Sequence, residues 1–402
     1  MKKRIHGSGK LYPRWNTRMR GLLAVAMTIV VLLAGFSVNV RGTEAVTTEG
    51  TGRYECQSAI LMEASTGEIL YEQNPDEALP PASVTKIMTL LLVMEALEAG
   101  KIQYSDMVTA SAYACSMGGS QIYLKEGEQM SVEDMIKSVV IASANDAAVA
   151  LAEHIAGTED AFVELMNQRA DELGMKNTNF ENTNGLDDTA TNHVTSARDI
   201  AIMSQALIRH SKITEYSSIW MDTIRDGAFG LTNTNRLVRF YNGATGLKTG
   251  STSKAGFCIS ATAQREGLSL ICVIMASPTR DIRNAAATSL LDWGFANYTV
   301  YRHPAGVLEP IKMLGGESSA CKVSYPEFTA VVPKSDVEKV EYVTDLPAEM
   351  AAPIQKGETV GSIVYSIGEK EIGRSDIVSE ETVEKIGFWG VFVRILRSMS
   401  FF

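Results

Sequence analysis

The sequence predicts an α/β (α+β) domain, built from an antiparallel sheet and helices, followed by a small all-β domain and an amphipathic C-terminal helix. Strand-like runs stand at both ends of residues 52–300, and helical periodicity fills the middle of that segment. After residue 305 the pattern changes to short alternating runs broken by Gly and Pro. The chain of 402 residues is also too long for one ordinary core. We therefore expect domains at 52–300 and 305–378 and a terminal helix at 380–402.

The first 45 residues differ from the rest of the chain. Seven Lys and Arg precede residue 22, and residues 22–40 carry no charge. A basic segment followed by an apolar run is typical of an export signal, and the small residues around 43–45 suit a cleavage site. We expect residues 1–45 to be a signal peptide and the exported protein to lie at the outer face of the cytoplasmic membrane, in the cell envelope. An uncleaved membrane anchor is the alternative, because the apolar run is long for a signal.

The charge of the remaining chain argues against a nucleic-acid partner. Residues 1–45 contain eight of the 37 Lys and Arg but only one of the 47 Asp and Glu, so the rest has a net charge of −17. A phosphate-binding surface needs clustered cations, and none is seen in the sequence after the signal. We expect no binding to nucleic acid.

The first elements are a hairpin and a central helix. Within residues 56–73, two apolar runs flank the turn sequence Ser-Thr-Gly. Residues 83–99 follow with apolar positions at helical spacing, and Gly100 ends this helix. A helix that is apolar on most sides is buried, so we expect this one at the centre of the domain.

Further helical segments fill the middle of the domain. Residues 131–157 indicate two helices around a break at 143–145, and helices are also expected at 161–173 and 195–210. Between the last two, residues 177–193 form a long polar loop rich in turn-forming residues.

The C-terminal part of this domain returns to strands. Residues 243–277 have a strand pattern that includes a hairpin of 255–263 and 268–276, and a helix at 280–296 follows. Because strands stand at both ends and helices between them, we expect one antiparallel sheet that combines N- and C-terminal strands.

The five cysteines and five histidines favour neither a disulfide framework nor a metal site. The cysteine count is odd and the spacing is wide, and no histidine stands in a ligand-spaced cluster. Buried free thiols are the expected state. Pairing of Cys258 with Cys272 is the alternative, because a hairpin could bring them close. We expect no metal and no cofactor.

The β domain at 305–378 contains nothing that indicates catalysis, so we expect a spacer or docking module. In residues 383–402 a helical wheel places eight apolar side chains on one broad face and Arg394 and Arg397 on the other side. This segment is too short and too charged to span a bilayer, but it suits a helix that lies in the membrane interface. We expect residues 383–402 to bind a membrane surface. A helix docked on the protein is the alternative.

Ser83 and Lys86 stand three residues apart where the central helix begins. Positions i and i+3 share a helix face. A lysine whose pKa is lowered by burial or by a nearby cation can take the proton of a serine and make it a nucleophile. The first helical turn also offers free N–H groups to a developing negative charge. Taken alone, the pair is better explained as a helix cap with an incidental lysine, because Ser-x-x-Lys often occurs by chance and serine is a common cap.

Two further motifs make the catalytic interpretation the stronger one. Ser143-x-Asn145 stands at the helix break, 60 residues after Ser83. Lys248-Thr249-Gly250 follows 105 residues later, in the strand region. Ser-x-x-Lys, Ser-x-Asn and Lys-Thr-Gly, in this order, are the signature of penicillin-binding proteins and serine β-lactamases.

Beyond these motifs, the chain resembles low-molecular-mass penicillin-binding proteins, the D-alanyl-D-alanine carboxypeptidases of the peptidase S11 family. The resemblance runs from residue 52 to the end and includes "LPPASVTKIMT", "ASANDAAVALAEHIAG", "LGMKNTNFENTNGLDD" and "GATGLKTGSTSKAGFCISATA". It implies a transpeptidase/β-lactamase-like catalytic domain. It also implies a serine-type enzyme that removes the terminal D-alanine from peptidoglycan stem pentapeptides and is acylated by β-lactams such as penicillin.

The resemblance implies roles for the first two motifs. Ser83 would attack the carbonyl of the penultimate D-alanine, and Lys86 would be its base. Ser143 would relay a proton to the leaving group. Asn145 would hold Lys86 and the substrate amide in place.

The third motif would bind the substrate, again by resemblance. Lys248 would bind the terminal carboxylate and keep the site electropositive, with help from Thr249. Gly250 would let the substrate lie along the strand. The backbone N–H groups of Ser83 and Ser251 would hold the oxyanion.

Three other activities stay open at this point. A β-lactamase shares the acylation step, but class A enzymes place their deacylating glutamate in a Glu-x-x-Leu-Asn setting. Here Glu181 lies in the corresponding loop without that Leu-Asn. A peptidoglycan endopeptidase is the second alternative. A non-catalytic envelope protein that only binds β-lactams or peptidoglycan is the third, although no motif has lost a residue.

Overall fold

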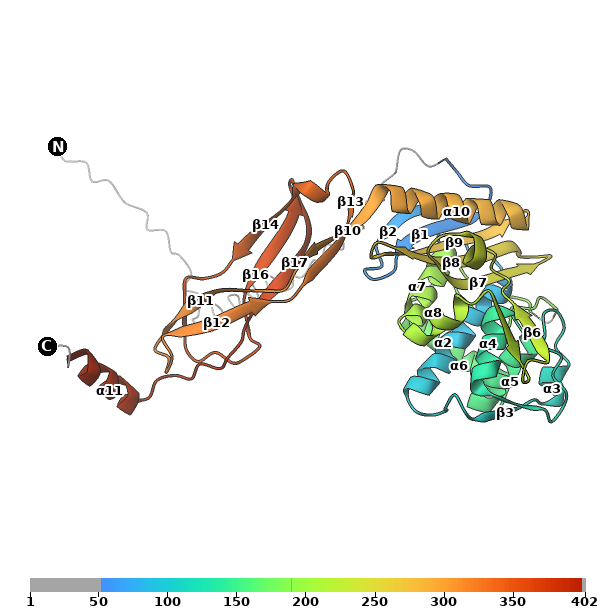
Figure 1. The fold of residues 1–402 in the computed structure, drawn as a ribbon, viewed down its shortest axis with the longest axis horizontal. Coiled ribbons are helices and arrows are strands. Elements are labelled where there is room, and N and C mark those ends of the chain that lie inside the picture. The colour runs from blue at the N-terminus through green and yellow to red at the C-terminus, as the bar shows by residue number, and fades with distance from the viewer. Residues whose placement is uncertain (1–51, 189, 400–402) are drawn as a thin grey trace, which may run out of the picture. The chain divides into compact units, whose positions relative to one another are not determined.

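The computed structural model describes residues 52–188 and 190–399 (Figure 1). The expected export signal lies outside the described residues, so it stays a prediction. Up to residue 297 the described chain forms a five-stranded sheet with helices, and after that it is all-β until a terminal helix. The predicted fold class is confirmed.

An antiparallel sheet organises the first domain, in the order β2-β1-β9-β8-β7. Its strands are β1 (Ser58–Glu63), β2 (Ile69–Gln73), β7 (Ala244–Thr252), β8 (Gly256–Arg265) and β9 (Leu268–Ser277). As expected, β1 and β2 come from the N-terminal end of the domain and the other three from its C-terminal end. Strand β7, which carries the Lys-Thr-Gly motif, forms one edge of the sheet.

The two faces of the sheet pack against different helices, because neighbouring residues of a strand point to opposite faces. In β1, Ile60 and Met62 belong to the core shared with the helical part, whereas Ala59 and Leu61 belong to a second core. Helix α10 (Arg280–Asn297) supplies the helical side of that second core. Figure 1 shows α10 on one side of the sheet and the long helices of the helical part, which are described below, on the other.

This alternation also decides the state of two cysteines. Cys258 lies in the first core and Cys272 in the second, so the two thiols are on opposite faces of the sheet. Both are free and buried. The expected buried free thiols are confirmed for Cys258, Cys272 and Cys321, whereas the free thiols of Cys56 and Cys115 are only partly buried. The alternative pairing of Cys258 with Cys272 is excluded.

The helical part surrounds one central helix, α2 (Lys86–Glu98), as the apolar pattern predicted. The other helices here are α3 (Ala112–Cys115), α4 (Val132–Ile141), α5 (Asn145–Ala156), α6 (Glu159–Glu172), α7 (Ala197–Ile208), α8 (Ser211–Ser217) and α9 (Leu237–Phe240). Two small hairpins complete it, β3 (Met107–Thr109) with β4 (Gln129–Ser131) and β5 (Met221–Ile224) with β6 (Phe229–Thr232). These hairpins and the helices α3, α8 and α9 were not predicted.

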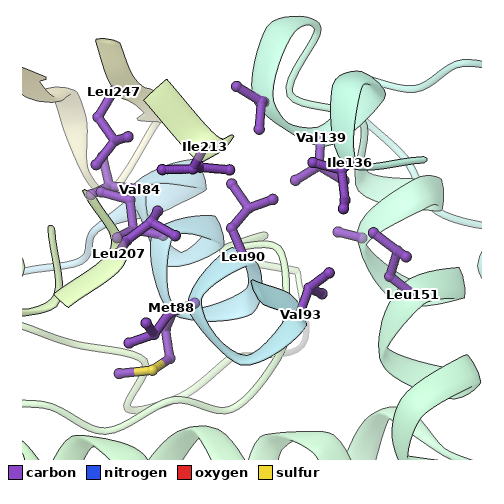
Figure 2. Close-up of a cluster of buried hydrophobic side chains, with 14 of the residues drawn as sticks. Val84, Met88, Leu90, Val93, Ile136, Val139, Leu151, Leu207, Ile213 and Leu247 are labelled. Carbon is purple, nitrogen blue, oxygen red and sulfur yellow. The ribbon is translucent and has the colours of Figure 1, made fainter. Parts of the chain in front are cut away.

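The packing of α2 fixes the part of the chain that carries the motifs. Figure 2 shows Met88, Leu90 and Val93 leaving α2 in different directions, into the surrounding core. Val84 and Leu247, the chain neighbours of Ser83 and Lys248, belong to the same core (Figure 2). The first and third motifs are therefore held by buried apolar neighbours.

The second domain is all-β, as predicted. Its strands are β10 (Tyr298–His303), β11 (Gly306–Leu314), β12 (Ala320–Tyr325), β13 (Phe328–Pro333), β14 (Val340–Asp345), β15 (Glu349–Ala351), β16 (Thr359–Ile367) and β17 (Lys370–Ser379). A short 3₁₀ turn, η2 (Val337–Lys339), precedes β14. β10 pairs with β13, and the other strands form a six-stranded sheet in the order β14-β16-β17-β12-β11-β15. This domain has its own core, in which Tyr365 is fully buried.

The described chain ends with helix α11 (Phe388–Met399), which begins later than the expected amphipathic segment. Its apolar side chains are exposed, with 78% of Phe388 and 73% of Trp389 accessible to solvent. Arg394 Nη2 donates hydrogen bonds to the carbonyls of Gly316 and Glu317, at 3.1 and 3.0 Å. Within residues 52–188 and 190–399, no helix has the length and apolar character needed to cross a membrane.

Candidate active site

Ser83 lies on a 3₁₀ turn, η1 (Ala82–Thr85), and not on the first turn of an α-helix. The α-helix begins with Lys86, and Ser83 caps neither element with its side chain. Its hydroxyl instead contacts Lys86 Nζ at 2.9 Å. Ala82, directly before Ser83, has a φ of +49°, a conformation that costs a non-glycine residue about 1–3 kcal/mol. The backbone directly before Ser83 therefore has a strained conformation.

Lys86 Nζ reaches two more acceptors besides Ser83. These are the side-chain oxygen of Asn145, at 2.5 Å, and the backbone carbonyl of Asn184, at 2.8 Å. Both oxygens can only accept hydrogen bonds. A neutral amine has two N–H groups and one lone pair, so with both N–H groups used the lone pair is left for the hydroxyl proton of Ser83.

The surroundings favour this neutral amine. Lys86 is completely buried, and burial lowers its pKa well below the usual lysine range. The positive charge of Lys248 lowers that pKa further, while the carboxylate of Asp146 opposes the shift. A lysine with a depressed pKa can act as a base near neutral pH.

Ser143 and Asn145 lie at the break between α4 and α5, where the sequence predicted it. Ser143 has a φ of +63°, and its Oγ accepts a hydrogen bond from Lys248 Nζ at 2.8 Å. Asn145 Nδ2 donates to the carbonyl of Gly118 at 2.7 Å, which fixes the amide so that its oxygen faces Lys86. The second motif therefore contacts both lysines of the site.

Lys248 is a second buried cation. Burial is the main reason that its pKa falls to about 7, and the nearby guanidinium of Arg283 lowers it further. Arg283 is itself buried, and it donates to the carbonyl of Cys258 and to Asn284 Oδ1 rather than to a carboxylate. Lys248, when protonated, and Arg283 behind it thus give the site positive charge, which favours an anionic ligand.

The rest of the third motif lies along the edge strand β7. Thr249 Oγ1 donates to Thr234 Oγ1 at 2.8 Å, and Ser251 is exposed further along the strand. A Cβ atom on Gly250 would come within 2.8 Å of both Pro81 O and Ser83 N. Glycine at this position therefore lets β7 approach the turn that carries Ser83.

The loop after α6 closes the remaining side of Lys86. Thr89 Oγ1 donates to the carbonyl of Thr183 at 2.6 Å, which holds the loop on α2. Glu181 is exposed, and its carboxylate accepts from the N–H groups of Thr191 and Asn192 and from the Thr191 hydroxyl. Its charge is satisfied within the loop, which is not the arrangement expected of a deacylating base.

The structure brings most of the predicted site residues into contact with one another, but not the Thr249 hydroxyl, which pairs with Thr234, or the exposed Ser251. Direct contacts join Ser83, Lys86 and Asn145 in one group and Ser143 with Lys248 in another. Two contributors were missed by the sequence reasoning. Asn184 acts through its backbone carbonyl, for which side-chain identity gives no signal, and Arg283 comes from a helix far along the chain. In the described part of the chain, no group of three or more His, Cys, Asp and Glu is arranged to hold a metal ion.

Two family models match most of this chain. Residues 44–279 match the peptidase S11 family, described as D-alanyl-D-alanine carboxypeptidase, and residues 297–385 match the C-terminal domain of penicillin-binding protein 5. The D-alanyl-D-alanine carboxypeptidase DacF of Bacillus subtilis (strain 168) is 41% identical over 343 residues, covering 83% of this chain and 87% of the relative.

Solved structures give the same result. Penicillin-binding protein 5 from Haemophilus influenzae is similar with a TM-score of 0.74 and 33% identity, over 83% of this chain and 99% of that chain. Penicillin-binding protein D2 from Listeria monocytogenes, solved in its ampicillin-bound form, is similar with a TM-score of 0.56 and 31% identity. That match covers 61% of this chain and 99% of the other.

Proposed function

The chain belongs to the peptidase S11 family of D-alanyl-D-alanine carboxypeptidases, and on this premise we propose that Ser83 is its nucleophile. The protein is a serine-type D-Ala-D-Ala carboxypeptidase, and its family works through a serine acyl-enzyme. Its substrate would be the peptidoglycan stem pentapeptide, from which it removes the terminal D-alanine. The observation that carries the assignment is the 2.9 Å contact between Ser83 Oγ and Nζ of the buried Lys86.

Acylation is the first proposed step. The neutral amine of Lys86 takes the proton of Ser83 while Ser83 Oγ forms a bond to the carbonyl carbon of the penultimate D-alanine. Asn145 and Asn184 hold the two N–H groups of that amine, which supports a lone pair aimed at Ser83. The oxyanion then forms beside the backbone N–H groups of Ser83 and Ser251.

The leaving group needs a proton when the C–N bond to the terminal D-alanine breaks. We assign this donation to Ser143, whose Oγ accepts from Lys248 Nζ and therefore has its own O–H free to donate. The proton that Lys86 took from Ser83 then passes to Ser143, so the protons balance. The positive charge of Lys248, with Thr249 beside it, would bind the terminal carboxylate of the substrate.

Deacylation completes the cycle. Water attacks the ester carbon and gives one proton to Lys86. The bond between that carbon and Ser83 Oγ then breaks, Lys86 returns the proton to Ser83 Oγ, and the shortened peptide leaves as a carboxylic acid. β-Lactams would acylate Ser83 in the same way, because they present a reactive amide carbonyl and a carboxylate. Their leaving nitrogen stays tethered to the acyl group, so the ester should persist. The ampicillin-bound relative supports this proposal.

We place the protein outside the cytoplasmic membrane, after removal of residues 1–45, because the proposed substrate is a cell-wall peptide and its relatives are named as D-alanyl-D-alanine carboxypeptidases and penicillin-binding proteins. Attachment would come from α11, whose exposed face includes Phe388, Trp389 and Phe392. Tryptophan and phenylalanine beside arginine are typical of helices that lie in the membrane interface.

Release of D-alanine tests this function. Purified full-length protein is incubated with diacetyl-L-Lys-D-Ala-D-Ala, and free D-alanine is assayed over time. We expect steady release that Ser83→Ala lowers by about 1,000-fold or more, and that Ser218→Ala, an exposed serine on another helix end, leaves unchanged. Release by Ser83→Ala at the wild-type rate would remove Ser83 from the mechanism.

A further inference from the structure

A buried histidine contacts the turn that carries the nucleophile. His193 Nε2 lies 2.7 Å from Thr85 Oγ1, and Thr85 Oγ1 donates to the carbonyl of Ala82 at 2.8 Å. Thr85 is fully buried, and His193 exposes 7% of its surface. His193 comes from the end of the polar loop, 108 residues from Thr85. Nothing in the proposed proton transfers uses either side chain.

These contacts form a hydrogen-bond series from His193 through Thr85 to the carbonyl of Ala82, and the partners of His193 fix which group donates at each step. The backbone N–H of Glu181 donates to His193 Nδ1 at 2.9 Å, so Nδ1 carries no proton. The neutral ring then has its proton on Nε2 and donates it to Thr85 Oγ1. The hydroxyl of Thr85 is left to donate to Ala82. Burial lowers the pKa of His193 to about 4, which keeps the ring neutral near pH 7.

The hydrogen-bond series ends on the peptide group between Ala82 and Ser83. A peptide group is planar and normally trans, so its C=O and N–H point in opposite directions in one plane. Holding the carbonyl of Ala82 therefore sets the direction of the N–H of Ser83, which is a proposed donor to the oxyanion. Because Ala82 has a φ of +49°, this peptide needs support to keep its orientation.

We propose that His193 is a positioning residue, which acts through Thr85 and the carbonyl of Ala82 to orient the N–H group of Ser83 toward the oxyanion. The inference rests on the proposed role of Ser83. The loop thus supports catalysis at two points, since the carbonyl of Asn184 also holds Lys86 at 2.8 Å. Loss of this support should slow the acylation of Ser83 and leave the binding of the substrate carboxylate unchanged.

Two pairs of variants separate the hydrogen bonds from the bulk of the side chains. Thr85→Ser keeps the hydroxyl, and Thr85→Val removes it. His193→Gln keeps an amide N–H near the position of Nε2, whereas His193→Asn keeps a polar group near Nδ1 but does not reach Thr85. The second-order rate constant for penicillin acylation is measured on full-length protein, below the melting temperature of every variant.

We expect Thr85→Val and His193→Asn to lose about 10- to 100-fold in acylation rate, and Thr85→Ser and His193→Gln to stay within about threefold of wild type. Because His193 acts through Thr85, the double variant with both Thr85→Val and His193→Asn should be acylated no more slowly than Thr85→Val alone. If the two losses multiply, or if Thr85→Val acylates at the wild-type rate, the inference is wrong. If His193→Asn does not fold, the Thr85 pair decides.

A control separates this inference from the proposed function. Ser83→Ala is treated with penicillin in parallel. A covalent adduct on Ser83→Ala would overturn the nucleophile itself, and with it the inference. No adduct on Ser83→Ala, together with wild-type acylation of Thr85→Val, would leave the nucleophile standing and overturn only the role of His193.

Discussion

Lys86 shows how single contacts set the chemistry of one residue. Its amine is buried among oxygen atoms that accept hydrogen bonds, and no carboxylate pairs with it directly. Burial and the charge of Lys248 both lower its pKa, and both act on the charged form. A lysine in this setting loses its proton far more readily than an exposed lysine, which is the requirement for a base.

The charge of Lys248 should therefore be visible in the pH dependence of acylation. The neutral form of Lys86 is present above its pKa, so acylation rises with pH along an acid limb set by Lys86. Lys248→Met removes a charge that lowers this pKa, so the pKa of Lys86 rises and the acid limb moves to higher pH. The kcat/KM for the peptide should also fall by about 100-fold, because the carboxylate loses its partner.

The matched control for that experiment is Lys254→Met, which removes an exposed charge just after the end of β7, the strand that carries Lys248. Penicillin acylation is measured across pH for both variants. Lys254→Met should leave the limb in place. An acid limb that stays at the wild-type pH in Lys248→Met would show that Lys248 does not control the protonation of Lys86.

At the scale of residues, the sequence indicated the side chains of the three motifs but neither the backbone groups nor the more distant side chains that support them. Residue type and spacing were enough to single out Ser83, Lys86, Ser143, Asn145 and Lys248 as candidates, and their catalytic roles stay predictions. The carbonyl of Asn184 could not be found, since every residue has one. His193 and Arg283 were missed because their partners, Thr85 and Lys248, are far away in the chain.

At the scale of elements, the loop of residues 181–193 must pack closely on the 3₁₀ turn. A Cβ atom on Gly185 would lie 1.9 Å from the carbonyl oxygen of Ala82 and 2.8 Å from Thr85 Oγ1. Gly185 also has a φ of +83°, which an L side chain rarely adopts. The contact between loop and turn thus requires glycine for two reasons.

A second glycine separates these two reasons. Gly157 also has a φ of +83°, but a Cβ atom there meets nothing within 4 Å. Gly157→Ala should cost about 1–2 kcal/mol of unfolding free energy from the backbone alone. Gly185→Ala should cost about 1–3 kcal/mol more and should also slow acylation. Urea unfolding and penicillin acylation check this, and equal effects of the two variants would contradict the close packing.

Helix α11 makes a separate prediction at the same scale. Phe392→Glu and Gly390→Glu add the same charge, but positions 390 and 392 lie on opposite sides of the helix. We expect Phe392→Glu to lower binding to phosphatidylglycerol-containing vesicles by about tenfold or more, and Gly390→Glu to have a much smaller effect. Cosedimentation of residues 46–402, without the apolar run at 22–40, measures this. Equal losses would argue against insertion of the apolar face.

Long periodic elements were predictable, and short ones were not. The apolar pattern of residues 83–99 gave the central helix, although its first turn proved to be 3₁₀ and α2 begins at Lys86. Helix α8 and the hairpin of β5 and β6 were missed because they span few residues and have weak periodicity. Tertiary packing, not local pattern, stabilises such elements.

At the scale of the whole molecule, one core holds the site, a second lies under α10 and includes Val331 of the β domain, and a third lies within the β domain. The motifs come from a 3₁₀ turn, a helix break and an edge strand. Apolar residues beside each motif, Val84, Ala144 and Leu247, pack into the core shared by the sheet and the helical part. The all-β domain and α11 have no residue in this constellation. The residues of the candidate site therefore all lie in the first domain, and the proposed membrane contact of α11 would be made by a separate part of the chain.

The most direct test of this account is the intact mass of the full-length protein after treatment with penicillin. We predict one penicilloyl group per chain, stable over hours, located by peptide mapping on Ser83 and absent from Ser83→Ala. Rapid consumption of penicillin with no lasting adduct would indicate a β-lactamase instead. An adduct that persists in Ser83→Ala would contradict the central claim that Ser83, activated by Lys86, forms the acyl-enzyme.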